Sequence, residues 1–288
     1  VLLVSGDPTP RFPEGETDWL ELALEPFASA GRDARRVELA DLIETTTSGE
    51  DEFEATALDK ARVVVLANVR QLTDEQLAAM RRFVERGGGL IVFLGDRVNA
   101  PWYNTRFADR TSGLLPATLA GLSGRGIDFD EPARIVTRRY THPALAMWND
   151  PRNGTLSDAA IRIWYALQPL HIGDESVSVM ARLDSGQPFL VERRIGEGVA
   201  IVCATAADKD WSNLPARGFY LPLVQQLVTY AASRAEPPRN VETGATLVAH
   251  LPAEAAGGEV TITTPRGDTL AVEPHLDADR AVARFDHT

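Results

Sequence analysis

The sequence has almost no cysteine: Cys203 is the only one among its 288 residues. A single thiol excludes an internal disulfide and a metal site built from several thiolates. Cys203 lies in the apolar run 199–204, which predicts a strand, so we interpret it as a small buried apolar residue. Long hydrophobic runs are also missing, since no window reaches the roughly 18–20 apolar residues that a membrane span needs.

Positive charge is scarce as well. The chain has 29 Lys and Arg residues against 41 Asp and Glu residues, which gives a formal net charge of -12. A negative surface repels phosphate backbones, and the paired arginines are scattered along the sequence rather than gathered in one segment. These features argue against nucleic-acid binding. A hydrophobic share of 44% is typical of a globular protein rather than a disordered one.

The first two thirds of the sequence alternate strand-like and helix-like patterns. Strands are predicted over residues 1–5, 35–39, 62–67, 90–94, 133–138, 161–167, 177–183, 189–194 and 199–204, and helices over 17–30, 73–86 and 217–233. Turn sequences at 184–187 and 195–198 predict that the last three strands form an antiparallel meander, and the polar segment 44–54 is expected to be an exposed, mobile loop. The fold class is therefore α/β, with a flavodoxin-like, mostly parallel sheet and helices on both faces.

A proline-rich break at Glu236-Pro237-Pro238-Arg239 divides the sequence into two domains. Residues 1–235 form the α/β domain, and residues 240–288 form a small β module with predicted strands at 245–250, 259–263, 269–272 and 281–285. We expect this module to be a truncated β-sandwich. The chain opens directly on an apolar run without a signal peptide and closes within a strand-like alternation, so we expect a piece of a larger protein whose flanks include membrane anchors.

The turn Gly95-Asp96-Arg97 follows a central predicted strand, where open α/β sheets place their ligand crevices. A nucleophile elbow at this turn requires Ser or Cys, and Asp96 supplies neither a hydroxyl nor a thiol. Asp96 can bind a cation weakly or pair with Arg97. In the plainer interpretation it only caps the next helix or shapes the turn.

Two carboxylates, Asp208 and Asp210, follow the strand 199–204 and are separated by one residue. They can coordinate a cation, or they can cap a following helix. His142 precedes Pro143, where a helix opens after a strand, and we interpret it as structural because the five histidines lack the spacing of a helical metal pair. Loop aromatics can form a sugar or partner surface or can pack against the rim of the sheet. They are Trp102, Tyr103, Trp148 and Trp211.

Three segments carry a resemblance to a known family. The run from Phe83 to Asp96, FVERGGGLIVFLGD, resembles the helix-to-elbow segment of class I glutamine-amidotransferase-like domains. The segments LVERRIGEG (190–198) and DKDWSNLP (208–215) are similar to the version found in large bacterial membrane proteins, familiar from planctomycetes, that also carry a von Willebrand factor A domain. Thr141-His142-Pro143 is similar to a motif of the related trehalose-utilisation (ThuA-like) branch.

The resemblance implies the fold of residues 1–235, a crevice at the rim of the sheet, and a place in the cell envelope, on the periplasmic side of a membrane-anchored protein. The family's glutaminase chemistry uses a Cys at the elbow and a His-Glu pair near the end of the domain. This sequence has Asp96 at the elbow, and the segment with Asp208 and Asp210 contains no His. The family's catalytic triad is therefore not carried over.

We weigh three hypotheses for function. The first is a non-catalytic binding or scaffolding domain with an unknown protein or small-molecule ligand, without cofactor and without catalytic residues, that meets a membrane only through flanking segments. The second is a hydrolase with a carboxylate- or metal-assisted site at Asp96, Asp208 or Asp210, which requires these carboxylates to converge with at least one strongly shifted pKa. The third is a carbohydrate-binding domain, which requires an open Trp or Tyr ring. The candidate crevice residues are Asp96, Arg97, His142, Asp208, Asp210 and Trp211.

Overall fold

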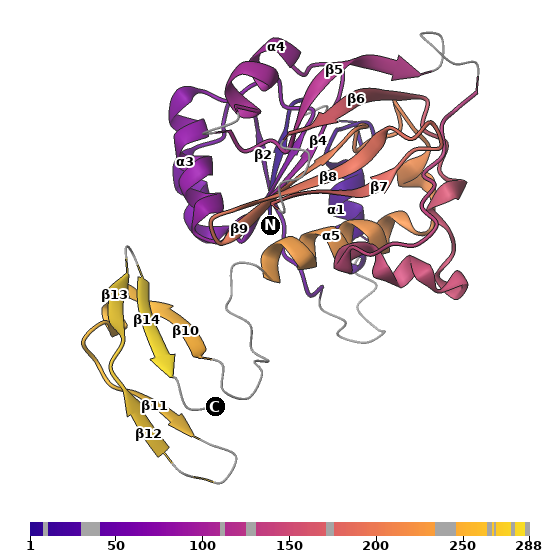
Figure 1. Cartoon of the computed structure of the whole chain (residues 1–288). Helices are drawn as coiled ribbons and strands as arrows, with labels where there is room; N and C mark the ends of the chain where they lie inside the picture. Colours follow the sequence, from indigo (N-terminus) through magenta and orange to yellow (C-terminus); the bar gives the residue numbers. More distant parts are fainter. Residues whose placement is uncertain are drawn as a thin grey trace. The chain divides into compact units, whose positions relative to one another are not determined.

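The computed structural model divides into two compact units, Val1–Ala235 and Glu236–Thr288 (Figure 1). The structure describes residues 1–7, 11–29, 41–109, 113–124, 131–170, 176–233, 246–263, 267, 269–277 and 280–285. The strand predicted at 35–39 and the break at 236–239 lie outside these ranges.

The first unit is built on a seven-stranded sheet with the order β2-β1-β3-β4-β9-β8-β7 (Figure 1). Neighbours from β2 to β9 run parallel, whereas β8 and β7 are added antiparallel. The predicted α/β class with a mostly parallel sheet is confirmed, and so is the meander of its last three strands. The strands are β1 (Leu2–Ser5), β2 (Thr46–Gly49), β3 (Val63–Ala67), β4 (Gly89–Phe93), β7 (Val177–Arg182), β8 (Pro188–Ile195) and β9 (Gly198–Cys203).

The middle of the sheet is apolar on both faces. Every residue of β3, β4 and β9 is buried, as is expected for parallel strands that are covered by helices on each side. Helices α1 (Asp18–Leu24) and α5 (Tyr220–Ser233) pack together on one face, and α3 (Asp74–Glu85) covers the other (Figure 1). Two short helices, α2 (Pro26–Ser29) and α4 (Ala100–Trp102), complete the set.

Local sequence explains where the helices begin and end. The predicted capping box of α3 is confirmed, since the Thr73 side chain accepts from the Gln76 N–H and the Gln76 side chain accepts from the Thr73 N–H. The single helix predicted over 17–30 is wrong. It is interrupted at Glu25, because Pro26 has no N–H to continue the hydrogen-bond ladder and disfavours helical geometry in the residue before it.

Two further predictions need correction. The segment 44–54, expected as a loop, contains β2, which pairs in parallel with β1 from Thr46 opposite Leu2 to Gly49 opposite Ser5. The strand predicted over 133–138 is reduced to isolated bridges, Ala133 with Ile161 and Ile135 with Leu183. In both cases the pairing is set by tertiary neighbours rather than by the local apolar pattern.

A separate antiparallel pair, β5 (Ala117–Gly124) and β6 (Ile163–Pro169), lies beside the main sheet, and β5 was not predicted. Short non-α turns connect the elements of this unit. They are the 3₁₀ helices η1 (Ala55–Lys60), η3 (Pro143–Asn149), η4 (Pro151–Asn153), η5 (Leu156–Asp158) and η6 (Leu214–Ala216), and the π-helical turn η2 (Tyr103–Phe107).

The second unit is all β, as predicted. Three antiparallel strands have the order β10-β14-β13, and two more, β11 and β12, form a hairpin. Its elements are β10 (Leu247–Pro252), η7 (Ala253–Ala255), β11 (Val260–Thr263), β12 (Thr269–Val272), β13 (His275–Asp277) and β14 (Arg280–Phe285). The short β13 was not predicted.

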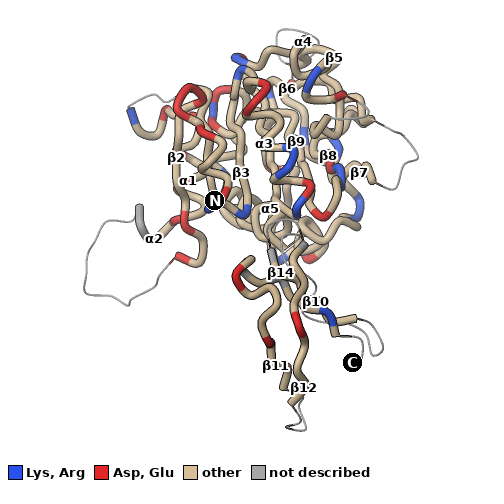
Figure 2. Tube along the Cα trace, turned by 90° about the vertical axis from the view of Figure 1, so that its left-hand side faces the viewer, with Lys and Arg blue, Asp and Glu red and all other residues tan. Residues whose placement is uncertain are grey.

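Charge in the first unit is spread over many elements. Figure 2 shows Lys and Arg positions on several strands and loops of the described residues, interspersed with Asp and Glu positions. Within the described residues, no helix has both the length and the apolarity that crossing a membrane requires.

Candidate functional site

Polar and acidic side chains collect where the central parallel strands end. Asn68 directly follows β3, Asp96 follows β4 by way of Gly95, and Asp208 lies beyond the end of β9. Glu16 comes from the segment between β1 and α1. Because β1, β3, β4 and β9 are adjacent and parallel, their carboxyl ends share one edge of the sheet. We call Glu16, Asn68, Asp96, Asp208 and Asp210 the carboxyl-edge cluster.

Asn68 is the centre of this cluster. Its Nδ2 donates to Glu16 Oε1 at 2.5 Å and to Asp96 Oδ1 at 2.8 Å, and its Oδ1 accepts from the Arg97 N–H at 2.9 Å. The Arg97 bond fixes the orientation of the amide, because a backbone N–H can only donate. Two oxygens that share one nitrogen lie no farther apart than the two bond lengths combined. Glu16 and Asp96 are therefore neighbours although 80 positions separate them in the sequence.

Two glycines make room for Asn68. A Cβ on Gly95 would lie 2.2 Å from the Asn68 side chain, and one on Gly6 would lie 1.9 Å from the Asn68 carbonyl oxygen. Asn68 itself has a left-handed backbone with φ of 51°, which Asn tolerates better than most residues. The backbone at the ends of three strands is thus shaped around one buried amide.

The floor of the cluster is buried and its rim is exposed. Asn68, Asp208 and Glu16 are 2%, 5% and 7% exposed, whereas Asp96 and Asp210 are open to solvent. Glu16 Oε2 is buried and has no hydrogen-bond partner among the described residues. The site is therefore a patch of negative charge that continues inward to a carboxyl with one unsatisfied oxygen.

Burial and mutual repulsion raise the pKa values of the two buried carboxyl groups, Glu16 and Asp208. Desolvation, followed by the charge of Asp208, raises the pKa of Glu16 to about 8, and the Asn68 hydrogen bond opposes that rise. Desolvation also raises the pKa of Asp208 to about 6, with the charges of Asp210 and Asp96 acting in the same direction. At neutral pH, Glu16 is therefore mainly protonated and Asp208 mainly ionised.

Strand β6 holds the loop that carries Asp208. The Tyr165 N–H donates to the Ala204 carbonyl at 2.9 Å, the Ile163 N–H donates to the Trp211 carbonyl at 3.1 Å, and the Thr205 hydroxyl donates to the Ile163 carbonyl at 3.0 Å. Within the loop, Asp208 Oδ1 accepts from the Asp210 N–H at 3.0 Å. The same strand brings Tyr165 to the site, where burial and then the charge of Asp96 raise the pKa of the phenol.

Of the six predicted crevice residues, the structure brings Asp96, Asp208 and Asp210 together. The charges of Asp96 and Asp210 both act on Asp208 and on Glu16. Arg97 donates its backbone N–H to Asn68, and its guanidinium forms an ion pair with Glu50 at 2.6 Å. The charge of this guanidinium also acts on Asp96.

His142 belongs to a different part of the molecule. Its Nε2 lies 2.8 Å from Glu192 Oε2, its Nδ1 accepts from the Ala144 N–H at the start of η3, and its ring meets Tyr230 of α5 edge-on. Glu192 pairs with Ile201 in the middle of β9 rather than at its carboxyl end. His142 thus caps η3 against the body of the sheet, in agreement with its structural interpretation and against its place among the crevice residues.

The loop aromatics pack against other side chains and are not exposed to solvent as open rings. Tyr103, Trp148 and Trp211 are buried, and the Trp211 ring rests against Tyr165 with centroids 5.8 Å apart. Trp102 is half-buried and packs against Tyr103. None of these four rings is the open platform that the carbohydrate-binding hypothesis requires.

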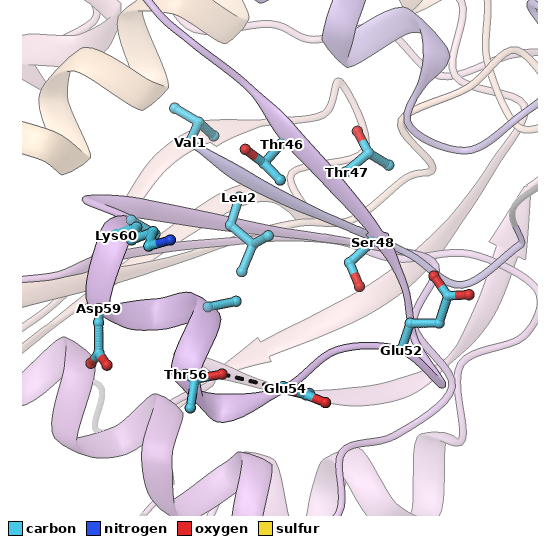
Figure 3. A pocket seen from close by; sticks show the side chains of 12 residues that line it. Val1, Leu2, Thr46, Thr47, Ser48, Glu52, Glu54, Thr56, Asp59 and Lys60 are labelled. Atoms are coloured by element: carbon cyan, nitrogen blue, oxygen red, sulfur yellow. Dashed lines mark hydrogen bonds between the residues drawn. The ribbon is translucent and has the colours of Figure 1, made fainter.

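A second concave region lies at the β2 edge of the sheet (Figure 3). This hollow of about 630 Å³ lies between β1, β2 and η1, and Leu2 and the Thr46–Ser48 segment form one wall. Its acidic side chains, Glu52, Glu54 and Asp59, are all exposed. The carboxyl-edge cluster is the stronger chemical site, because two of its carboxyl side chains are buried.

Within the described part of the chain, no group of three or more His, Cys, Asp or Glu side chains is arranged to hold a metal ion. The chemistry that the carboxyl-edge cluster can perform is acid–base chemistry. It depends on which of its carboxyl groups carry a proton.

Sequence reasoning missed Glu16, Asn68 and Tyr165. Asn68 carried a usable signal, because it directly follows the clearest buried strand and the rule applied to Asp96 covers it equally. Glu16 carried none, because its segment is a loop without a pattern. Tyr165 is delivered by β6, whose antiparallel partner β5 was not foreseen.

Comparisons with known proteins extend only to the fold. No protein-family model matches the chain, and no curated protein matches its sequence. Among solved structures, the cytoplasmic proteins STM3548 and STM1381 from Salmonella typhimurium are similar, with TM-scores of 0.55 and identities of 14% and 15%; each match covers 80% of this chain and 98% of the other. A β-galactosidase from Bacillus circulans matches 98% of this chain over 41% of its own length, with a TM-score of 0.48 and 14% identity. At these identities the likeness to the two Salmonella proteins concerns the fold alone.

Proposed function

We propose that the α/β unit is a hydrolase that uses two carboxyl groups, Glu16 as the proton donor and Asp208 as the proton acceptor. The observation that carries this proposal is that two carboxyl side chains are buried at one edge of the sheet, Glu16 at 7% and Asp208 at 5% exposure, with Glu16 held by Asn68. Burial raises the pKa of both groups, to about 8 for Glu16 and about 6 for Asp208. Neighbouring carboxyls whose environments separate their protonation states supply an acid and a base at the same pH. This is the carboxylate-assisted alternative among the hypotheses drawn from the sequence.

The hydrogen bonds at Glu16 select the oxygen that carries its proton. Oε1 accepts from Asn68, so the proton of the neutral carboxyl is placed on Oε2, which has no partner among the described residues. In a hydrolysis, Asp208 takes a proton from the attacking water while Glu16 Oε2–H gives one to the leaving atom. Asp208 then releases its proton to solvent and Glu16 takes one up from solvent, so that both groups return to their starting states.

Asn68 and Asp96 would act as positioning residues. Asn68 holds Glu16 and Asp96 by the same amide, and Asp96 adds to the negative field that keeps the proton on Glu16. Thiol chemistry is not part of the proposal, because desolvation raises the pKa of the buried Cys203 thiol to about 12. The order of the parallel strands, β2-β1-β3-β4, supports a flavodoxin-like arrangement within this proposal.

A second candidate is the non-catalytic binding or scaffolding domain of a membrane-anchored envelope protein. The specific observation in its favour is that an exposed Asp96, rather than a thiol, occupies the turn after β4. The amidotransferase-like relationship and the periplasmic location remain predictions from the resemblance.

The test has two parts. Wild type, E16Q and D208N are assayed against p-nitrophenyl esters, glycosides, phosphates and p-nitroanilides, with E54Q, at an exposed position, as the matched control. We expect a bell-shaped pH dependence of kcat/KM, with a rising limb near pH 6 and a falling limb near pH 8, that the two site variants lose and E54Q keeps. In parallel, ¹³C-carboxyl NMR titration measures both groups. A Glu16 that titrates near 4.5 overturns the proposal even if no substrate in the panel is hydrolysed.

A further inference from the structure

The carboxyl-edge cluster has an excess of negative charge that nearby cations do not neutralise. Within the described ranges, none of its four carboxyl side chains forms an ion pair with Lys, Arg or His. Two basic side chains of the adjoining loops have partners of their own: Arg97 forms an ion pair with Glu50, and Lys209 lies over the Trp19 ring at 4.8 Å from its centroid. The charge of Arg97 also acts on Asp96. Charge concentrated in this way attracts a cation from solution.

A separate observation indicates that a ligand completes the site. Glu16 is 7% exposed, and its Oε2 is buried without a hydrogen-bond partner in the described part of the chain. The Asn68 amide donates both to the other oxygen of this carboxyl and to Asp96, which places the Glu16 side chain in the cluster. A buried carboxyl oxygen without a partner loses free energy that a donor from a ligand restores.

We infer that the substrate of this site carries a protonated aliphatic amine, which binds among Asp96, Asp208, Asp210 and Glu16. The inference rests on the proposed function, because it names the class of substrate. An ammonium group brings a positive charge and three N–H donors, so it can reach acceptors on separate loops without the fixed coordination geometry of a metal ion. A neutral polyol also donates hydrogen bonds, but it leaves the repulsion between these carboxylates in place.

A metal ion fits less well than an amine. A hard divalent cation requires several ionised oxygen ligands, and within the described residues no three acidic or His side chains have the geometry to supply them. Ammonium binding has a distinct signature, because a positive charge beside Glu16 favours its ionised form. The groups that face Glu16 electrostatically are Asp96, Asp208 and Asp210 of the cluster and Tyr220 of α5, and none of these is basic. Amine binding therefore releases the proton of Glu16.

The experiment compares 1,4-diaminobutane with 1,4-butanediol by isothermal titration calorimetry at pH 7. The two probes have the same length and differ in charge. Each titration is run in two buffers of different ionisation enthalpy, which counts the protons released. We expect binding of the diamine but not of the diol, with up to about one proton released per ligand in wild type and none in E16Q.

Variants separate the site from the general acidity of the chain. D96N/D210N removes two charges from the exposed rim of the cluster and should weaken diamine binding about tenfold or more. E54Q/D59N removes two charges from the hollow at the β2 edge and should change the affinity by less than about twofold. All four positions are exposed, and Asn at position 96 keeps a side-chain oxygen that can accept from the Asn68 amide.

Three results would overturn the inference: equal binding of the diol, equal weakening by the two double variants, or displacement of the diamine by lower concentrations of Mg²⁺ or Ca²⁺. None of them decides the acid–base proposal, which depends on the titration of Glu16 and Asp208. Conversely, diamine binding without proton release, together with a Glu16 that titrates near 4.5, would leave an amine-binding site without the proposed catalysis.

Discussion

The buried carboxyl of Glu16 makes the stability of the fold depend on pH, and Glu16→Gln should remove that dependence. The pKa of Glu16 is raised from 4.5 to about 8 in the folded state. Between these values the folded chain binds a proton that the unfolded chain releases, so the free energy of unfolding decreases as pH rises. The stabilising contribution is fully present below pH 4.5 and is lost as pH passes through 8.

The magnitude follows from the width of this interval. One pKa unit corresponds to about 1.4 kcal/mol, so the interval from 4.5 to about 8 is worth on the order of 5 kcal/mol. Asp208, with a pKa of about 6, also makes stability decrease with rising pH, but only below about pH 6. Above pH 6.5, Glu16 therefore dominates. E16Q, which is neutral at every pH, should exceed wild type by a few kcal/mol at pH 9 and differ little from it at pH 5.

Urea unfolding followed by tryptophan fluorescence at pH 5, 6.5, 8 and 9 measures this difference. E54Q is the matched control, because the same substitution at an exposed position should leave the slope of wild type unchanged. The reasoning is refuted if wild-type stability does not fall between pH 6.5 and 9. It is also refuted if E16Q is destabilised by the same amount at every pH, which would indicate a packing role alone.

Three further outcomes test the geometry of the site. D208N should lower the pKa of Glu16 from about 8, because Asp208 is the largest charge that raises it; an unchanged ¹³C-carboxyl titration would show that the two groups do not interact. G95A should cost more than about 2 kcal/mol in urea unfolding, because its methyl group would overlap the buried amide beside it, whereas G218A, which meets open space, should stay within about 0.5 kcal/mol; equal stability of the two would contradict the described contact. Cys203 should not react with a thiol reagent at pH 8 until the chain is unfolded, since its pKa is about 12, and reaction with the native protein would contradict its burial.

Much of the framework could be predicted from sequence. The strands that form the middle of the sheet are apolar on both faces, and that pattern is local and unambiguous. The cap of α3 is equally local. The edge strand β2 was missed because its Thr46–Gly49 sequence is polar and its strand geometry depends on β1.

Part of the site could be predicted from local sequence, and part of it depends on tertiary contacts. Asp96 and Asp208 follow buried strands, so the rule that places ligands at the carboxyl ends of parallel strands finds them. The role of Glu16 depends on the Asn68 amide, on its burial, and on repulsion from Asp208, and each of these exists only after folding. A raised pKa is a property of the surroundings, and the sequence of one loop does not contain them.

The position of β9 in the sheet has a consequence for synthesis. β4 pairs with β3 on one side and with β9 on the other. In the chain, the whole segment from 94 to 197 separates β4 from β9. As the chain emerges from the ribosome, the apolar edge of β4 stays without its partner until residues 198–203 have been made. Such an edge can pair with another nascent chain. Because Asp208 follows β9 closely, the proposed acid–base pair is completed soon after β4 gains its second partner.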